Sequence, residues 1–586
     1  MKNHYFATAL RESLRQGYGW PALRADLLAG VTVGIVALPL AMALAIASGV
    51  PPQHGLYTVV IAGAVIALAG GSRVNISGPT AAFVVVLLPI TQQFGLGGLL
   101  LASVMAGVIL LAMGLGRLGR FIELVPYPVT IGFTAGIGVV IATLQLKDFL
   151  GLDVGASQGH FLSQLWALLR ALPSFHWQDC LIGLLTLAVL LLWPRWVKKI
   201  PGHLAALLVG SVAALLLTRW LPGFEVATIG SRFQYHIGGV IGHGIPPLLP
   251  HFDWPWRFSG ADGKALALDF DTVQALLGPA FAIAMLGAIE SLLCAVVADG
   301  MAGTRHDSNG ELIGQGLGNI VAPFFGGIPA TAAIARTATN VRAGAVSPLA
   351  AVIHALVVLG AMVSLAGLLG YIPMAALAAL LLVVAWNMSE ARHFVRVIRI
   401  APGNDILVLL TCFGLTVLFD MVIAVTVGIG LAALLFIKRT VDLTESHRVE
   451  RPALSAEEMP EQIALYDING PLFFGAAHKA LGTLKTVTPG LRVVLLDLRD
   501  VNLVDMTGLV ALESLIETAR RQQLGLVFCG LNARLKVKLR RIGIRKQRGH
   551  LEFANNIDEG IERALRMRDA QPAPSGDSST AWRPDD

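Results

Sequence analysis

The sequence predicts an α-helical polytopic membrane protein, with about fourteen transmembrane segments in two inverted repeats of seven, followed by a small cytosolic α/β domain. Three observations predict this fold class: an apolar composition, a series of apolar stretches with basic turns, and an interrupted stretch that recurs in both halves. Of the 586 residues, 55% are hydrophobic and only 14% are charged. The mean hydropathy is +0.68. A soluble fold could not bury this much apolar surface.

Residues 1–26 are predicted to form a cytosolic N-terminal segment. They are mixed and basic, without an apolar core and a small-residue cleavage site, so the first span is expected to direct insertion itself. The formal charge of +6 implies no nucleic-acid partner, because the basic residues cluster at the ends of apolar stretches. The four cysteines are isolated in the sequence, which predicts neither a disulfide framework nor a metal site. We expect no cofactor.

A window of about 19 residues finds fourteen apolar stretches, which together predict a membrane domain over residues 27–439. They lie near residues 27–47, 54–70, 78–91, 96–116, 125–146, 180–194, 203–220, 272–297, 312–326, 336–346, 348–369, 373–388, 404–419 and 422–437. If the N-terminus is cytosolic, the turns on the cytosolic side hold the clusters of arginine and lysine. This is the positive-inside pattern, and it predicts that both termini are cytosolic.

The third and tenth stretches are interrupted in the same way. They follow "GGSRVNISGPTAAF" and "FFGGIPATAAIARTATNVRAG", and each has a Gly-Gly pair, a short extended run and a helix start rich in small or hydroxyl residues. The two stretches hold the same place in two halves of seven, and an odd number of crossings inverts the second half. Broken backbone at membrane depth is tolerated only where it is buried in protein or lines a cavity. The interruptions therefore predict a ligand site.

Each interrupted stretch is expected to begin a half-helix near the middle of the membrane. Ser77 or Gly78 is predicted as an N-cap and Pro79 as the first helical residue, which leaves Thr80 and free N–H groups at the tip. Each tip carries roughly half a positive charge, so two tips that face one another favour an anion. Arg336 adds a full charge and a planar donor group suited to an oxyanion. The alternative for Arg336 is a snorkelling cytosolic arginine.

Glu290 lies among apolar residues in "AMLGAIESLLCAVVADG", within the eighth stretch. A charged side chain in the middle of a span costs about 2.5 to 3.5 kcal/mol on insertion scales, which indicates a functional role. With Arg336 nearby, this carboxyl could exchange a proton within the working pH range. Our hypothesis is that protonation removes its repulsion of an anion and frees Arg336 to bind it. The alternative is a permanently ionised structural partner of Arg336.

The composition becomes polar after Arg439. A linker over residues 440–460 leads to "IALYDI", "RVVLLDL" and "GLVFCGL", which alternate with helical patterns and predict an α/β domain over residues 461–568. The tail, residues 569–586, is predicted to be disordered. No glycine-rich phosphate loop follows the strands and no P-loop appears, which argues against a nucleotide-binding fold and an ATP-driven pump.

Several motifs resemble the successive signatures of the SulP (sulfate permease) anion transporter family, in family order over residues 20–440. They are "VALPLAMALAIASGVPPQHGLY", "GGSRVNISGPTAAF", "ESLLCAVVADG", "NGELIGQGLGN" and the arginine after "ATAAIA". They are most similar to bacterial members that transport four-carbon dicarboxylates, the DauA type. The resemblance implies a core domain and a gate domain, elevator-like alternating access and a homodimer.

By position, the resemblance assigns the anion site to the start of the third stretch and to the backbone at the start of the tenth, and it assigns proton coupling to Glu290. Many relatives have glutamine after the proline of the first stretch, where this chain has Leu40. The substrate would pack against leucine there, which favours a longer organic dianion over sulfate. The predicted substrate-binding residues are Ser77, Gly78, Thr80, Ala333, Ala335, Arg336, Leu40 and Leu44.

In the C-terminal domain, "NGPLFFGAA" and "DVNLVDMTGLVAL" resemble the STAS domain that follows many SulP transporters. Asp505, Thr507 and Gly508 match the loop in which related anti-sigma antagonists carry a phosphorylatable hydroxyl. Thr507 is therefore a candidate regulatory site, with helix capping as the alternative. A cytosolic regulator could bind this domain.

These features predict a secondary active transporter in the bacterial inner membrane, and not an enzyme. The expected reaction is import of four-carbon dicarboxylates such as succinate, fumarate or aspartate with protons. The alternatives are sodium- or proton-driven uptake of bicarbonate or sulfate, a passive anion channel, and a membrane sensor that signals through the STAS domain. The expected partners are a small anionic substrate, protons, the lipid bilayer and a second copy of the chain.

Overall fold

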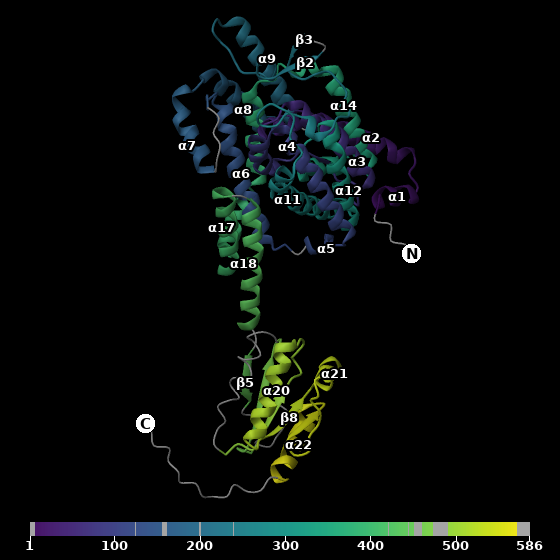
Figure 1. The fold of residues 1–586 in the computed structure, drawn as a ribbon, viewed down its shortest axis with the longest axis vertical. Helices are drawn as coiled ribbons and strands as arrows, with labels where there is room; N and C mark the ends of the chain where they lie inside the picture. Colours follow the sequence, from purple (N-terminus) through teal and green to yellow (C-terminus); the bar gives the residue numbers. More distant parts are fainter. Residues whose placement is uncertain are drawn as a thin grey trace. The chain divides into compact units, whose positions relative to one another are not determined.

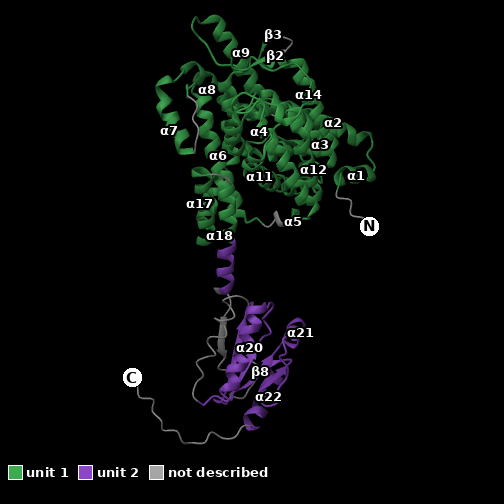
Figure 2. Ribbon diagram, viewed as in Figure 1, with its two compact units in different colours: residues 1–432 green, residues 433–586 purple. Residues whose placement is uncertain are grey.

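The computed structural model describes residues 6–122, 125–154, 161–197, 201–237, 240–419, 421–442, 445–449, 460–472 and 490–570. The chain divides into two compact units, residues 1–432 and 433–586, and each is described by itself (Figure 2). Most of the predicted linker and the predicted tail from residue 571 lie outside the described residues.

Unit 1 is built from long apolar helices (Figure 1). Its main helices are α2 (Trp20–Ala47), α3 (Pro52–Ala69), α4 (Ala81–Leu115), α6 (Tyr127–Phe149), α8 (Trp177–Trp196), α9 (Gly202–Trp220), α11 (Phe270–Ala302), α12 (Ser308–Val321), α13 (Ile334–Arg342), α14 (Leu349–Leu369), α15 (Met374–Met388), α17 (Gly403–Leu418) and α18 (Met421–Asp442), which continues into unit 2. Ten helical segments of the described chain are long and apolar enough to cross a membrane. The prediction of a polytopic helical membrane protein is confirmed.

Shorter elements connect these helices. They are α1 (Thr8–Arg15), α5 (Gly119–Ile122), α7 (Phe161–Ala171), α10 (Ile229–Arg232), α16 (Ala391–Ile400), and a hairpin of β2 (Gln234–Ile237) and β3 (Val240–His243). All fourteen predicted stretches correspond to a helix or to half of one. Two of them fall in α4, which is broken at Gly95, where φ is +70° and ψ is −171°. This conformation favours glycine, and the backbone of Gly260 packs where a Cβ would stand.

The helices of unit 1 pack as two groups. In the first group, α4 packs against α11 and α12, α2 packs against α14 and α13, and α3 packs against α12. In the second group, α6 packs against α15 and α17, and α8 packs against α9 and α15. Figure 1 shows α2, α3 and α12 on the right of unit 1 and α6, α8 and α17 on the left. Small residues permit close packing within a group: a Cβ at Gly107 of α4 would stand 2.7 Å from the carbonyl oxygen of Gly316 in α12.

Two very short strands join the interrupted segments. β1 (Ser77–Gly78) precedes α4 and β4 (Thr331–Ala332) precedes α13, and they pair antiparallel with Ser77 opposite Ala332. The third and tenth segments therefore meet, as predicted. The predicted helix start is wrong by two residues: Ser77 and Gly78 are extended, and Thr80 occupies the N-cap position of α4, with φ −124° and ψ 158°. The physical reason is that the backbone of Ser77 and Gly78 pairs with β4 instead of beginning a helix.

Unit 2 contains a five-stranded sheet in the order β5-β6-β7-β8-β9, in which only β5 is antiparallel to its neighbour. Its elements are β5 (Glu445–Val449), β6 (Ile463–Asn469), β7 (Val493–Asp497), α20 (Met506–Arg521), β8 (Gly525–Cys529), α21 (Ala533–Arg541), β9 (Leu551–Ala554) and α22 (Ile557–Ala570). Apolar residues of α20 and α21 cover one face of the sheet, and those of α22 cover the other. Both faces are buried, which explains the nearly continuous apolar runs of β7 and β8.

Candidate anion-binding site

Arg336 lies in the first turn of α13 and is only 2% exposed. Its Nη2 donates a hydrogen bond to the carbonyl oxygen of Pro79 at 2.5 Å, so it links α13 to the start of α4. Among the described residues, no acceptor pairs with its Nε or its Nη1. Unpaired donors on a buried charge are costly, and an anion would satisfy them. The burial of the guanidinium argues against the snorkelling alternative.

The first turns of α4 and α13 add positive electrostatic potential around the Arg336 guanidinium. Thr80 and Ala333 occupy the two N-cap positions, and neither side chain accepts a hydrogen bond from its own helix. The first backbone N–H groups of both helices therefore lack a side-chain cap. Because each helix start carries roughly half a positive charge, the two tips and Arg336 form a site complementary to an anion.

Glu290 of α11 is half-buried and lies beside Thr80, whose Oγ1 donates to Glu290 Oε2 at 2.9 Å. Glu290 and Arg336 are both described, and no ion pair joins them: Arg336 instead donates to Pro79. The structure thus brings together Thr80, Glu290 and Arg336 from three different segments. It does not show the permanent ion pair of the alternative interpretation.

Ser77 and Gly78 point to opposite faces of β1, because side chains alternate along a strand. Ser77 Oγ accepts a hydrogen bond from Gln315 Nε2 at 3.0 Å. On the other face, a Cβ at Gly78 would stand 2.6 Å from Nη1 of Arg336. This geometry favours a supporting role for the Ser77 side chain and a close approach to the guanidinium for Gly78.

The remaining predicted residues lie at the start of α13 and on α2, and they differ in burial. Ala333 donates its backbone N–H to the carbonyl oxygen of Ile76 at 2.9 Å, and Ala335 is exposed at the tip of α13. Leu40 is half-buried and Leu44 is buried, both on α2, which packs against α13. Their contact with substrate remains a prediction.

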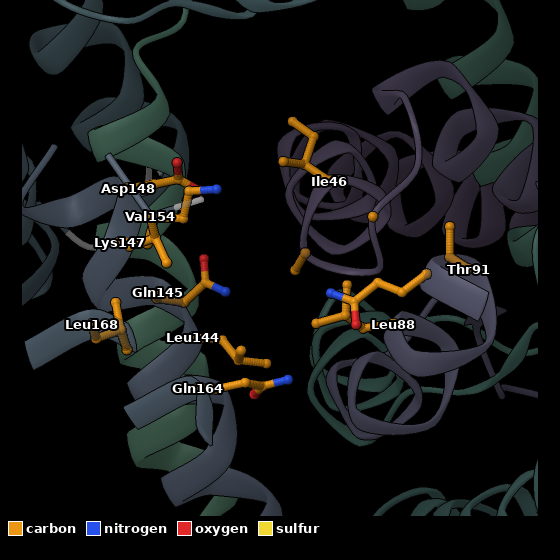
Figure 3. A pocket seen from close by; sticks show the side chains of 13 residues that line it. Ile46, Leu88, Thr91, Leu144, Gln145, Lys147, Asp148, Val154, Gln164 and Leu168 are labelled. Carbon is orange, nitrogen blue, oxygen red and sulfur yellow. The ribbon is translucent and has the colours of Figure 1, made fainter. Parts of the chain in front are cut away.

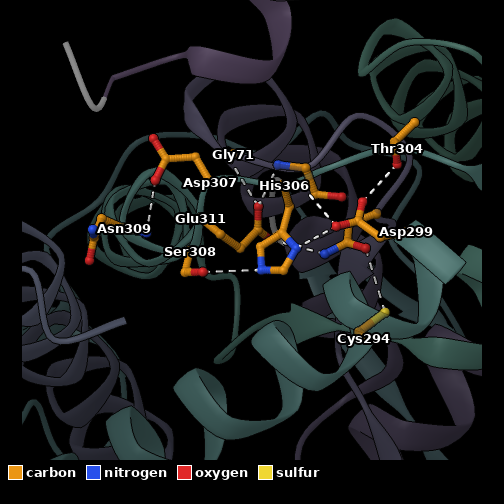
Figure 4. A network of polar contacts seen from close by, with 11 residues as sticks. Gly71, Cys294, Asp299, Thr304, His306, Asp307, Ser308, Asn309 and Glu311 are labelled. Carbon is orange, nitrogen blue, oxygen red and sulfur yellow. Dashed lines mark hydrogen bonds and ion pairs between the residues drawn. The ribbon is translucent and has the colours of Figure 1, made fainter. Parts of the chain in front are cut away.

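One face of α12 holds the extended segments that lead into β1 and β4, which the sequence analysis missed. Glu311 is 1% exposed and accepts hydrogen bonds from the backbone N–H groups of Gly71, at 3.1 Å, and Ser72, at 3.0 Å. Its other oxygen accepts from Asn75 and Gln315, both at 3.2 Å. Figure 4 shows Glu311 beside Gly71. The signal was present in "NGELIGQGLGN", where polar residues recur at intervals of four on one helix face.

Asn319 supports the second strand in the same way that Glu311 supports the first. Its side-chain amide donates to the carbonyl oxygen of Ala330 at 2.8 Å and accepts from the N–H of Ala330 at 2.8 Å. The loop before α12 is fixed by Asp299, which accepts from Thr304 Oγ1 at 2.7 Å and from His306 Nδ1 at 2.7 Å (Figure 4). α12 and its loop thus position both strands.

His354 of α14 is a further polar residue that the sequence analysis missed. It is 0% exposed, and neither ring nitrogen has a hydrogen-bond partner in the described part of the chain. An isolated histidine in an apolar stretch gives no pattern from which this could be predicted.

In unit 2, Asp505 and not Thr507 caps α20. Its Oδ1 accepts from the N–H of Gly508 at 2.8 Å. Thr507 is half-buried in the first turn of the helix. Phosphorylation of Thr507 remains a prediction. Of "NGPLFFGAA", residues 473–477 lie outside the described part of the chain.

Comparison with known families identifies the chain. Residues 23–411 match the model of the sulfate permease family, and residues 456–560 match that of the STAS domain. The chain belongs to the SulP sulfate permease family. Its members are anion transporters, and this SulP protein also carries the predicted STAS domain.

Two proteins of similar sequence and one solved structure show which known proteins this SulP chain resembles. It is 41% identical over 546 residues to the putative sulfate transporter YvdB of Bacillus subtilis, covering 93% of this chain and 98% of YvdB. It is 30% identical over 583 residues to the bicarbonate transporter BicA of Picosynechococcus, covering 95% of this chain and 98% of BicA. The solved structure of SLC26A9 has the same fold, with a TM-score of 0.80 and 18% identity over 96% of this chain and 93% of that one.

The close approach of Gly78 to Arg336 gives a first prediction for this SulP protein. Gly78→Ala is expected to lower the initial rate of anion uptake by about tenfold or more, because the new methyl displaces the guanidinium from its site. Uptake into proteoliposomes, normalised to folded protein, measures the effect. Gly287→Ala is the matched control, since a Cβ at Gly287 would stand 3.5 Å from Phe83, an ordinary contact. An unchanged rate for Gly78→Ala would contradict the proximity argument.

Proposed function

We propose that this protein is a secondary active transporter of a small inorganic oxyanion, sulfate or bicarbonate, which binds between the tips of α4 and α13. The observation that carries the proposal is the buried Arg336, whose Nε and Nη1 lack partners among the described residues where the two half-helices meet. A planar guanidinium suits the oxygens of such an anion. The names of YvdB and BicA, a putative sulfate transporter and a bicarbonate transporter, support this substrate class.

The packing supports alternating access by movement of one helix group against the other. α4, α11 and α13 supply the proposed site, and all three belong to the first helix group. The site can therefore move as one body while the second group, built around α6 and α15, stays in place. Such motion of one repeat assembly against another is a common mechanism in transporters with broken helices.

Thr80 offers a physical means of coupling the anion to a proton. A hydroxyl has one proton to donate, and an ionised carboxylate can only accept. While Glu290 is ionised, it accepts the hydrogen bond of the Thr80 hydroxyl and repels an incoming anion. Once Glu290 is protonated, it can donate to Thr80 Oγ1, and the Thr80 hydroxyl becomes free to donate to the anion. We therefore assign proton coupling to Glu290 within the proposed function.

Transport of four-carbon dicarboxylates is the finer prediction that the comparisons do not support. YvdB is named for sulfate and BicA for bicarbonate. A longer dianion is expected if the substrate packs against Leu40, which is half-buried on α2. Succinate is therefore included in the test as the competing substrate.

The test is uptake of labelled sulfate, bicarbonate or succinate into proteoliposomes, with and without an inward gradient of protons or sodium. Gradient-driven accumulation of sulfate or bicarbonate, with little inhibition by succinate, is the expected result. Accumulation of succinate that the inorganic anions do not inhibit would instead favour the dicarboxylate transporter. Rapid flux without uphill accumulation would indicate a channel. Flux that persists without the STAS domain would exclude a pure sensor.

Glu290→Gln tests the coupling step. The variant is expected to keep anion exchange and to lose the stimulation of exchange by low pH, because a glutamine amide is neutral and can donate to Thr80 at every pH. Exchange rates measured across a pH series would show this. Asp271→Asn, which removes an exposed carboxylate at the start of the same helix, is the matched control. A pH profile like that of the wild type would refute coupling through Glu290.

The cellular setting remains part of the proposal. The positive-inside pattern supports a bacterial inner-membrane protein with both termini cytosolic. We further propose a homodimer and a cytosolic regulator that acts through the STAS domain. Accessibility of introduced cysteines at the two termini to an impermeant reagent would test the orientation.

A further inference from the structure

A cavity of about 410 Å³ lies between the two helix groups of unit 1, separate from the Arg336 site. One wall comes from the end of α2 and from α4, and includes Ile46, Leu88 and Thr91. The other wall comes from the end of α6 and from α7, and includes Gln145 and Gln164. Figure 3 shows these two sets of side chains facing each other across the gap.

The cavity lies near the C-terminal end of α2, away from the N-terminal segment. It lies at the end of α2, whose first residue is Trp20. Leu88 is seven residues beyond Ala81, the first residue of α4, which corresponds to roughly 10 Å along the helix. The cavity is therefore displaced from the proposed anion site along the helix that contributes to both.

The charges around this cavity are not balanced. Asp148 is neutralised by Arg232, whose Nη1 lies 2.6 Å from Asp148 Oδ1. Within the described ranges, Lys147 has no ion pair or side-chain hydrogen bond, and it is half-buried in the cavity wall. The cavity therefore carries a net positive charge, which comes from Lys147.

A buried amide provides a second, independent indication of a ligand. Gln145 is 5% exposed, and its side chain forms no hydrogen bond with any other described residue. Figure 3 shows its amide directed into the gap between the walls. The amide borders the open space of the cavity, where a ligand or water can form hydrogen bonds with it. The Gln145 amide can donate or accept, whereas the Lys147 ammonium only donates and carries a positive charge, so together they favour an anion over a cation.

We propose that this cavity is a second anion-binding site, which holds a hydrated small inorganic oxyanion between the two helix groups before the anion reaches Arg336. The inference rests on the proposed function for the identity of the anion. At about 30 Å³ for each water, the cavity has room for such an anion with part of its water shell. Because its walls belong to different groups, movement of one group against the other changes the site and releases its occupant.

Direct binding tests the proposal without requiring transport. Labelled sulfate, and bicarbonate in parallel, are titrated onto the purified full chain by equilibrium dialysis. Arg336→Gln is expected to remove one binding component and to leave a second, and adding Lys147→Gln or Gln145→Leu is expected to weaken the second component about three- to tenfold. Lys264→Gln, which removes an exposed lysine outside the cavity, should change neither component.

Uptake supplies the second measurement. For anion added on the cavity side, Lys147→Gln is expected to raise the half-saturating concentration about three- to tenfold and to leave the maximal rate unchanged. Complete loss of binding in Arg336→Gln alone, or wild-type behaviour of Lys147→Gln in both assays, would overturn the second site. If the protein takes up the anion but dialysis shows a single binding component, this inference fails and the proposed function stands. If dialysis shows two components but the protein takes up no anion, the proposed function fails and the second site stands. No binding of either anion to the wild type would overturn both.

Discussion

Replacing Arg336 with glutamine is expected to lower the initial rate of anion uptake at least about a hundredfold. The change removes the full charge and the donors Nε and Nη1, which have no partner among the described residues. Only the two helix tips would remain, and together they supply roughly one unit of positive charge. Initial rates of sulfate and bicarbonate uptake, normalised to folded protein in the liposomes, measure the loss.

The same substitution is expected to leave the protein folded. Glutamine relieves a buried charge with unpaired donors, so the melting temperature of the purified variant without substrate should equal or exceed that of the wild type. Arg336→Lys keeps the charge without the planar donor group, and it should retain a small fraction of the activity. Arg342→Gln, at the exposed end of the same helix, is the matched control and should transport normally. A stable Arg336→Gln variant with wild-type uptake would exclude Arg336 from the anion site.

The membrane helices could be predicted from the sequence because their signal is local. An apolar stretch of sufficient length forms a helix in lipid whatever its neighbours, since every backbone group is then satisfied within the segment. The interruptions at Gly70-Gly71 and Gly326-Gly327 were equally visible, because they place polar and small residues where a span should continue. These two signals predict the position of the proposed site. In the structure, Thr80 donates to Glu290, and Arg336 donates to Pro79, the residue before Thr80.

Long-range pairing could not be predicted in the same way. The predicted N-cap of α4 is Ser77 or Gly78, and the observed N-cap is Thr80. The difference arises because β1 pairs with β4, a strand more than 250 residues later. Nothing in the local sequence reports that partner. The cavity beside Lys147 is a further case, since its walls come from two helix groups whose contact depends on the whole fold.

The polar residues of α12 were missed for a different reason. The stretch was interpreted as one apolar span, although Glu311, Gln315 and Asn319 recur along one of its faces. Glu290 is predicted to be functional because it is a lone charge within an apolar helix. Glu311 lies near a helix start, where acidic residues are common and predict no special role. The structure shows that Glu311 is the more buried of the two and holds Gly71 and Ser72, in the segment that leads into β1.

This contrast gives a second large prediction, which compares the same chemical change at two buried carboxylates. Glu311→Gln is expected to destabilise the folded protein, because the Glu311 carboxylate accepts from four donors: the N–H groups of Gly71 and Ser72 and the side chains of Asn75 and Gln315. Glutamine has one oxygen acceptor and an NH₂ group that only donates. Two donors would then face the new NH₂ group.

Each buried donor left without an acceptor costs about 1 to 3 kcal/mol, so the expected loss is about 2 to 6 kcal/mol, a large part of the stability of a typical domain. Among the described residues, Thr80 alone donates a hydrogen bond to the Glu290 side chain. A glutamine oxygen can accept that bond, so Glu290→Gln should melt close to the wild type. Melting temperatures of the two purified variants and the wild type, in the same detergent, measure the difference. Equal melting temperatures for all three proteins would show that the four hydrogen bonds of Glu311 do not stabilise the segment before β1. A lower melting temperature in Glu290→Gln alone would make Glu290 the structural carboxylate and contradict its role in proton coupling.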